Sequence, residues 1–286
     1  MASPSSSARE ALQALGRRLR EIRIDANITG RRLGGDVGWH ESKVSKIEHG
    51  KTTPTPDDIR AWCARCGVPE QATELIASLH AVEGMFVEWR RMERTGLRQA
   101  QQQVVPLWER TRSFRIYNPR LIPGPVQTRA YIAALLTGLA ARRSIPDDIE
   151  AATQVRLDKQ RVVHEGDHRF AILLEESVLR FPIGGPETMA GQLGYLLTAS
   201  SFPSVSLGIV PLDADRSTMW PVEGFWMFDD ETVTAELVSG HLTITQPHEI
   251  AMYADAFRRL ADLAAYGADA RALITRAIEA VDHSRG

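Results

Sequence analysis

The chain has 286 residues, of which 43% are hydrophobic and 24% charged, and this length and composition predict two domains with ordinary hydrophobic cores. No stretch approaches the roughly 18 consecutive apolar residues of a transmembrane helix, and the polar residues 1–7 lack the apolar core of a secretory signal. We therefore expect a cytoplasmic protein with no membrane partner.

The net charge of −2 is unevenly distributed. Residues 1–53 carry ten basic and six acidic side chains (+4), and residues 81–120 carry eight and four (+4). Residues 121–286 carry fourteen basic and twenty-two acidic side chains (−8). A basic N-terminal part beside an acidic remainder indicates that one end meets an anion, and nucleic acid is the obvious candidate.

Five helices are predicted before residue 82, the first being an amphipathic helix over 8–24 with apolar residues at helical spacing. Thr29 offers an N-cap oxygen to a second helix over 30–37, and Gly50 is suited to close a third over 41–48. Thr55 or Pro56 opens the fourth helix and Pro69 the fifth. Cys63 and Cys66 are interpreted as packing residues of the fourth helix rather than as a metal or redox pair.

The spacing within residues 30–47 is typical of a helix-turn-helix. Two helices that meet at a steep angle need a small residue where they touch, which Gly34 supplies, and Gly38 tolerates the positive φ of the turn. Val44 and Ile47 then face inward from the third helix.

Residues 12–79 resemble the Cro/repressor, or xenobiotic-response-element, helix-turn-helix family. The resemblance lies above all in GWHESKVSKIEHGKTTPTPDDI, residues 38–59, which is similar to that family's recognition helix and the Pro-rich loop after it. It implies a transcription regulator that binds double-stranded DNA.

In such a motif the third helix lies in the major groove, with its N-terminal residues against the base edges. The candidates for base contacts are Glu41, Ser42, Lys43, Ser45 and Lys46. The candidates for phosphate contacts are Thr29, Arg31, Arg32, Lys51, Thr52 and Thr53. The alternative is that these side chains form a solvated helical face.

Residues 83–116 are predicted to be a helical linker that is rich in arginine. Arg90, Arg91, Arg94 and Arg98 either extend the DNA footprint or simply belong to a helix between two domains.

The remainder, 117–286, is predicted to be an α+β domain with a small mixed or antiparallel sheet. The β-like runs are 169–174, 205–210, 225–228, 233–237 and 242–245. The helices are expected over 126–139, 146–163, 186–200, 247–266 and 268–281. The fold class is thus a mainly α helix-turn-helix bundle over 1–82 followed by this α+β domain.

This second half resembles an uncharacterised domain that in actinobacterial regulators commonly follows a repressor-type helix-turn-helix. The resemblance covers most of residues 105–280 and lies in segments 121–131, 156–160, 173–185, 192–193 and 205–211. It implies regulation, in genomes where such genes often neighbour one for a small partner protein, and no established catalytic activity.

We expect no enzyme, no cofactor and no metal site. The carboxylates of Glu175 and Glu176 point in different directions along a strand and more simply form caps or salt bridges. His164 and His168 are four residues apart, but Gly166 breaks the helix that would align them as ligands.

A sensor or docking role fits this half better than catalysis. The candidate residues for an effector or partner contact are Arg120, Gln127, Arg156, Glu176, Trp220 and Trp226. The aromatic residues near 220–228 line a pocket or interface, or alternatively form a plain core. We expect a homodimeric regulator whose C-terminal domain responds to a small molecule or a protein. The alternative is an antitoxin-like or anti-activator protein that holds a small partner and autoregulates its own promoter.

Overall fold

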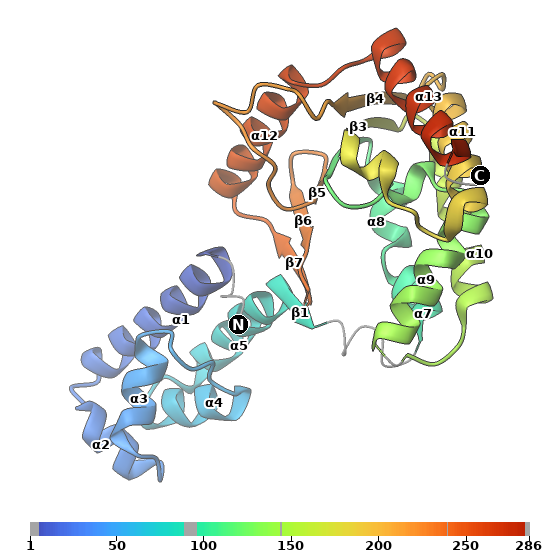
Figure 1. Ribbon diagram of the computed structural model, residues 1–286. Coiled ribbons are helices and arrows are strands. Elements are labelled where there is room, and N and C mark those ends of the chain that lie inside the picture. The colour runs from blue at the N-terminus through green and yellow to red at the C-terminus, as the bar shows by residue number, and fades with distance from the viewer. Residues whose placement is uncertain (1–5, 89–95, 144, 239, 284–286) are drawn as a thin grey trace. The chain divides into compact units, whose positions relative to one another are not determined.

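The computed structural model describes residues 6–88, 96–143, 145–238 and 240–283 (Figure 1). The chain divides into two compact units, Met1–Val87 and Glu88–Gly286. None of the described helices combines the length and hydrophobicity that a membrane crossing requires.

The N-terminal unit is a bundle of helices, drawn in blue to cyan in Figure 1. Its elements are α1 (Ser6–Asp25), α2 (Gly30–Asp36), α3 (Glu41–Glu48), α4 (Pro56–Arg65), the 3-10 turn η1 (Pro69–Gln71), α5 (Ala72–Met85) and, at its end, the short strand β1 (Phe86–Glu88). The helix-turn-helix prediction is confirmed, and the predicted bounds of α3 agree with the observed ones.

One apolar core joins the helices of this unit. Leu19, Leu33, Ile59 and Trp62 are completely buried in it, and the Trp62 indole donates a hydrogen bond of 3.0 Å to the Leu19 carbonyl. This bond satisfies the only polar atom of the tryptophan, so the ring fills the centre of the bundle at no cost in unpaired polar groups.

Helix α4 begins at a reciprocal cap. The Thr55 hydroxyl accepts from the Asp58 amide, while the Asp58 carboxylate accepts from the Thr55 amide. Cys63 and Cys66 are free and buried in the core, so their interpretation as packing residues is confirmed.

The prediction of one helical linker over 83–116 is wrong. Helix α5 ends at Met85, and two short helices, α7 (Leu97–Gln103) and α8 (Val105–Arg110), precede the strand β2 (Ser113–Asn118). Pro106, in the first turn of α8, cannot donate to the preceding turn, so a continuous helix is interrupted there. Arg90, Arg91 and Arg94 lie outside the described residues.

The C-terminal unit combines this strand with helices and five further strands. After α7, α8 and β2 come η2 (Gly124–Val126), α9 (Arg129–Arg143), α10 (Ile149–Lys159), η3 (Gln160–Val163), β3 (Arg169–Glu175), η4 (Glu176–Arg180), α11 (Gly185–Ala199), β4 (Val205–Val210), β5 (Phe225–Phe228), β6 (Thr232–Glu236), β7 (Gly240–Ile244), α12 (Pro247–Asp262) and α13 (Gly267–His283).

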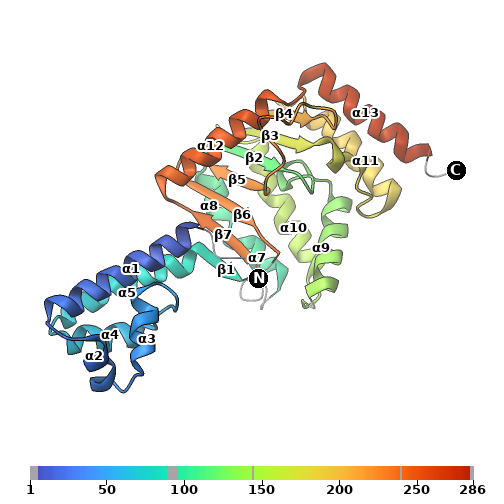
Figure 2. The ribbon, with the colours of Figure 1, turned by 60° about the vertical axis from the view of Figure 1, so that its left-hand side comes forward.

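The sheet of this unit is mixed, in the order β7-β6-β5-β2-β3-β4 among the described strands (Figure 2). Strands β2, β3 and β4 are parallel, with Phe114 opposite Phe170 and Phe170 opposite Val205. Strands β5, β6 and β7 continue the sheet antiparallel from β2. The parallel part needs helical crossovers, which α9, α10 and α11 provide. The predicted α+β class is therefore confirmed.

Helices cover both faces of the sheet, which is why its central strands are apolar at successive positions. Phe170, Ile172 and Leu174 of β3 lie in a core with residues of α8, α9, α11 and α13. On the opposite face the ring of Phe225 lies 4.9 Å from Tyr253 and 6.5 Å from Phe257, both on α12.

Candidate nucleic-acid interface and effector site

The turn between α2 and α3 depends on two glycines. A Cβ on Gly34 would lie 2.9 Å from the Trp39 carbonyl oxygen, closer than real Cβ atoms approach backbone. Gly38 has φ +75°, a value that glycine adopts without strain. The two positions expected from the sequence therefore set the angle at which α3 leaves α2.

A buried ion pair fixes α3 against α1. The Arg23 guanidinium binds both carboxylate oxygens of Glu48, at 2.6 and 3.2 Å, and also donates to the Ile28 carbonyl. A Cβ on Gly16 would lie 2.5 Å from the Ile47 carbonyl oxygen, so α1 and the end of α3 touch backbone to backbone. This pair was not predicted from the sequence, although a glutamate set among the apolar residues of α3 is a signal for it.

Helix α3 has one buried and one exposed side. Val44 and Ile47 are each only 1% exposed, whereas Ser42, Ser45 and Lys46 face solvent. The carbonyl of Lys46 accepts from the amides of residues 51 and 52, which ends the helix.

The N-terminus of α3 is held by local hydrogen bonds. The His40 ring accepts from the Ser42 amide at 3.2 Å and lies 2.8 Å from its hydroxyl. Glu41 is exposed and pairs with Arg31 of α2 at 3.2 Å.

Lys43 differs from its neighbours because it ties α3 to α4. Its ammonium lies 2.6 Å from the Asp58 carboxylate and 4.3 Å from the centre of the Trp39 ring. Burial alone would raise the pKa of Asp58, but hydrogen bonds from Lys43 and Thr55 hold this pKa below its ordinary value. Lys43 therefore already has a structural task in the free protein.

The six candidates for phosphate contacts frame α3 on both sides. Thr29 caps α2, its hydroxyl accepting from the Arg32 amide at 3.2 Å. Arg31 and Arg32 are exposed on α2, and Arg32 lies 3.9 Å from Asp36. In the loop after α3, Lys51 and Thr53 are exposed and Thr52 is half-buried.

In the C-terminal unit, Gln127, in the turn before α9, lies beside Arg156 of α10. Gln127 is 4% exposed, donates to the Ile122 carbonyl at 2.6 Å, and accepts from Arg156 at 3.3 Å. Lys159 lies one turn further along α10, beside Arg156, and its ammonium donates to the Gln101 amide oxygen at 2.9 Å. Arg156 donates to the same oxygen at 3.3 Å. Lys159 and Gln101 were not among the site residues predicted from the sequence.

Aromatic rings lie beside these cations. The Lys159 ammonium is 4.8 Å from the centre of the Trp108 ring, which in turn lies 5.3 Å from the ring of Trp226. A Cβ on Gly124 would be 3.5 Å from Trp108 and 3.9 Å from Trp226, so this turn lies close to both rings. We call Gln101, Trp108, Gln127, Arg156, Lys159 and Trp226 the α10 cluster.

The other three candidates of this unit make separate contacts. Arg120 is exposed and donates to the Glu236 carbonyl at 3.1 Å. Glu176 accepts from Arg180 at 2.8 Å and from the Leu212 amide at 3.0 Å. Trp220 is 65% exposed on the loop between β4 and β5. Phe225, Met227 and Phe228 are buried, as in a plain core.

Two other glutamines from the segments that carried the second resemblance fasten the turn before α9. Gln160 donates to the carbonyls of Gly124 and Gln127 at 2.6 and 2.8 Å. Gln192 is fully buried, donates to the Val126 carbonyl and accepts from the Thr128 amide. These side chains replace a regular ladder of backbone bonds, so their task is structural.

Glu175 and Glu176 point to different partners. Glu175 accepts from the Tyr117 hydroxyl at 2.8 Å and forms an ion pair with Arg216, and burial, together with the Glu175 carboxylate, raises the pKa of Tyr117 far above its ordinary value. His168 is hydrogen-bonded to the Thr111 carbonyl. Among the described residues no group of three or more His, Cys, Asp or Glu side chains is arranged to hold a metal ion.

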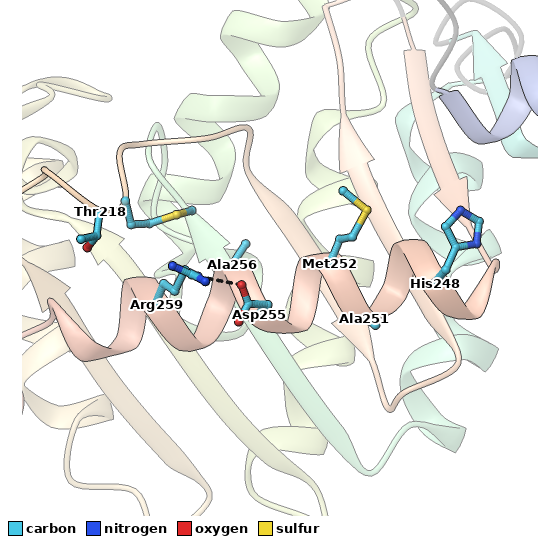
Figure 3. Close-up of a pocket in the computed structure, with 8 residues that line it drawn as sticks. Thr218, His248, Ala251, Met252, Asp255, Ala256 and Arg259 are labelled. Atoms are coloured by element: carbon cyan, nitrogen blue, oxygen red, sulfur yellow. Dashed lines mark hydrogen bonds and ion pairs between the residues drawn. The ribbon is translucent and has the colours of Figure 1, made fainter.

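An open groove of about 500 Å³ lies along α12 (Figure 3). Its lining residues are Thr218, Met219, His248, Ala251, Met252, Asp255, Ala256 and Arg259. Met252 is 68% exposed, and Arg259 lies 2.7 Å from Asp255.

The described geometry agrees with two family matches. Residues 14–76 match a helix-turn-helix domain, which puts the protein in the class of helix-turn-helix DNA-binding regulators. Residues 101–276 match the domain of unknown function DUF5753, and because this match spans more than half of the chain, the chain belongs to that family.

No curated protein matches the chain. The chain is similar to a solved structure of TrmBL2, an archaeal chromatin protein described as having a novel mode of DNA binding. The two share 13% sequence identity with a TM-score of 0.32, and the alignment covers 73% of this chain and 67% of the TrmBL2 chain. A likeness this low supports no conclusion about fold or function.

Proposed function

We propose that the protein is a transcription regulator of the Cro/repressor, or xenobiotic-response-element, type that reads double-stranded DNA with α3. The observation that carries the proposal is the division of α3 into a buried side, with Val44 and Ile47, and an exposed side, with Ser42, Ser45 and Lys46. In this class the second helix of the motif enters the major groove and presents its exposed N-terminal residues to the bases. Serine and lysine donate to the acceptors of guanine and adenine.

Phosphate contacts from both sides of α3 would fix its register on the duplex. Arg31 and Arg32 pair with Glu41 and Asp36 at exposed positions, where an ion pair contributes at most about 1 kcal/mol. A DNA phosphate can therefore take either arginine from its acid partner at little cost. Release of Arg31 would also free Glu41 to accept from the amino group of cytosine.

The test is a titration of labelled DNA with the full chain, using the protein's own promoter and a scrambled fragment. Replacing Ser42 and Lys46 together with Ala should abolish the preference for the promoter, because each base contact contributes about 1–3 kcal/mol of discrimination. Lys51→Ala is the matched control, because loss of a phosphate contact weakens binding to both fragments alike and lowers the salt dependence. An unchanged promoter preference in the double variant would show that α3 is not the reading helix.

The same proposal makes the protein a cytoplasmic homodimer of actinobacterial origin whose C-terminal domain responds to an effector. Two-fold DNA half-sites favour dimers of such modules. The division of the chain into two units supports separate tasks, DNA binding by the first unit and effector binding by the second. Sedimentation with promoter DNA tests the dimer, because a 1:1 complex of chain and duplex would contradict it.

We further propose that the C-terminal domain acts without catalysis and without a cofactor. The adjacent carboxylates Glu175 and Glu176 are both engaged, since Glu175 binds Tyr117 and Arg216, and Glu176 binds Arg180.

A second candidate is an antitoxin-like or anti-activator protein that holds a small partner protein, encoded nearby, while its helix-turn-helix autoregulates the promoter. The groove along α12, with its exposed Met252, favours this candidate (Figure 3). Co-purification from the native host tests it: a stoichiometric small protein that is lost on Met252→Glu supports the candidate, and a chain that purifies alone contradicts it.

A further inference from the structure

Two cations are withdrawn from water at one place on α10. Lys159 is 7% exposed and Arg156 is half-buried, and they stand one helical turn apart. Taking a cation out of water costs several kcal/mol unless an opposite charge and hydrogen bonds compensate. Proteins therefore almost never bury a lysine or an arginine fully unless it is paired.

The compensation that the chain itself provides is incomplete. Among the described residues no carboxylate lies within 4.0 Å of Arg156 or Lys159; their acceptors are the amide oxygens of Gln101 and Gln127. One oxygen of Gln101 serves both cations. Elsewhere in the chain the pattern is different, since the half-buried Arg216 meets Glu175 directly.

The electrostatic consequence is visible in Lys159. Burial and the charge of Arg156 lower the pKa of Lys159 to about 7, and Glu236, which opposes this shift, only partly offsets it. Burial likewise lowers the pKa of the Arg156 guanidinium. A guanidinium keeps its proton at neutral pH, so Arg156 remains a cation that needs an anion.

The surroundings indicate what kind of anion fits. The rings of Trp108 and Trp226 lie against the Gly124 turn beside the cations; Trp108 is buried, and Trp226 is half-buried. Few polar groups placed beside aromatic faces are the usual lining of a small-molecule site. Arginine supplies two parallel donors, which match a carboxylate or a phosphate.

We propose that Arg156 and Lys159 bind the carboxylate or phosphate group of a small effector whose apolar body lies against Trp108 and Trp226. This inference rests on the proposed function, in which the C-terminal domain senses an effector. The glutamines Gln101 and Gln127 hold the two cations in place until the anion arrives, and they join α7 and the turn before α9 to α10. An anion bound at the α10 cluster therefore contacts or displaces groups of three segments, namely α7, the turn before α9 and α10.

The direct test follows the thermal unfolding of the full chain in sodium phosphate, in sodium benzoate and in sodium chloride at matched ionic strength. The expected result is a saturable rise of a few degrees with phosphate or benzoate that chloride does not give, because a ligand that binds only the folded state stabilises it by mass action. A rise in unfolding temperature with phosphate but not with benzoate would identify a phosphate ligand, and a rise with benzoate but not with phosphate would identify a carboxylate ligand. If neither anion exceeds chloride, the assignment is wrong.

Two variants locate the effect. Lys159→Met and Arg156→Gln should each remove the anion-specific rise, while Arg161→Gln, which removes an exposed arginine from the next turn, should retain it. Because no carboxylate among the described residues lies within 4.0 Å of Lys159, Lys159→Met should unfold at the same or a higher temperature than the unmodified chain. A lower unfolding temperature with the anion effect intact would assign Lys159 a merely structural role and overturn the proposal. Should one variant not fold, the other gives the same decision.

The pH dependence supplies an independent readout. Above pH 7 the unliganded site holds a largely neutral Lys159, and anion binding must add a proton, so the anion affinity should fall by up to tenfold per pH unit between about pH 8 and 9, where phosphate and benzoate each keep one main ionic form. Arg156, Glu236 and His241 are the other charged or titratable groups concerned, and they remain in Lys159→Met, whose affinity should be nearly flat over this range. An unmodified chain with a flat profile contradicts the role of Lys159.

The outcome can be separated from that of the proposed function. If the anion binds but does not change the affinity for the promoter, the α10 cluster is an anion site without the proposed regulatory role. Promoter binding without anion binding leaves the regulator standing and removes the site. If an acidic peptide raises the unfolding temperature where phosphate and benzoate do not, the cluster receives a protein partner and the small-molecule proposal fails.

Discussion

The helix-turn-helix unit and the α10 cluster differ in how their cations are compensated. In the helix-turn-helix unit, the largely buried Arg23 lies 2.6 Å from Glu48 and the partly exposed Lys43 lies 2.6 Å from Asp58, so each of these cations has its own carboxylate. In the α10 cluster of the DUF5753 unit, Arg156 and Lys159 meet amide oxygens and, for Lys159, the Trp108 ring, and no carboxylate among the described residues lies within 4.0 Å of either cation. The first arrangement fixes a surface that must keep one shape. The second leaves charge uncompensated at a place where a ligand can supply it.

The largest effect should come from breaking the buried pair of the first unit. Glu48→Ala leaves Arg23 without its acid at 12% side-chain exposure, which should destabilise this unit by about 3 kcal/mol. Urea unfolding combined with hydrogen exchange of α1 and α3 measures it. Glu21→Ala is the control, because its pair with Arg18 is exposed and should change stability by less than about 0.5 kcal/mol. Equal effects of the two changes would remove the distinction between paired structural charge and surface charge.

Neighbouring glycines in α2 give a test of opposite signs. Gly34→Ala places a methyl group 2.9 Å from the Trp39 carbonyl and should destabilise the unit by about 2 kcal/mol, with loss of promoter binding. Gly35→Ala meets nothing within 4 Å and should stabilise it by about 0.5 kcal/mol with DNA binding retained. Circular dichroism melts and DNA titrations of both variants check this. Similar behaviour of the two would mean that the close approach of α2 and α3 does not shape the reading surface.

The burial of Lys159 in the second unit should affect how the free energy of unfolding depends on pH. Folding lowers the pKa of Lys159 from its ordinary value of 10.5 to about 7, so between these values the unfolded chain binds more protons. Stability attributable to Lys159 therefore rises with pH over this window, by at most about 1.4 kcal/mol per pH unit, and is independent of pH below it.

The difference between the unmodified chain and Lys159→Met isolates this effect, because buried groups such as Tyr117 and Cys63, whose pKa burial raises, titrate equally in both proteins. Urea unfolding at pH 7, 8 and 9 should find the advantage of the variant shrinking as pH rises. An advantage that stays constant would mean that Lys159 is not held in a charge-excluding environment.

Much of the fold could be predicted because local patterns carry it. The positions of Gly34 and Gly38 and the apolar spacing of α3 defined the helix-turn-helix, and five apolar runs defined β3 to β7. Strand β2 was missed because its alternating residues follow Pro106 and Trp108 within an arginine-rich stretch that favours helix. Only pairing with β3 and β5 reveals it as a central strand.

The candidate sites divide in the same way. Residues of α3 are close in sequence, so their common face could be predicted. Gln127 and Arg156 were selected singly, but Gln101 and Lys159 join them only because helices α7 and α10 pack together. Contacts between residues 55 or more positions apart, such as Gln101 with Arg156, leave no local pattern to read.

The central claim, that α3 reads DNA, is tested most directly by crosslinking from within that helix. The photoreactive residue p-benzoylphenylalanine is placed at position 45 of the full chain, where Ser45 is exposed, and in a control at Glu74, which is exposed on α5. After irradiation with the promoter fragment, position 45 should crosslink to bases within the protected site, while position 74 should not. Crosslinks from position 74 alone, or from neither position when binding is saturated, would contradict the account.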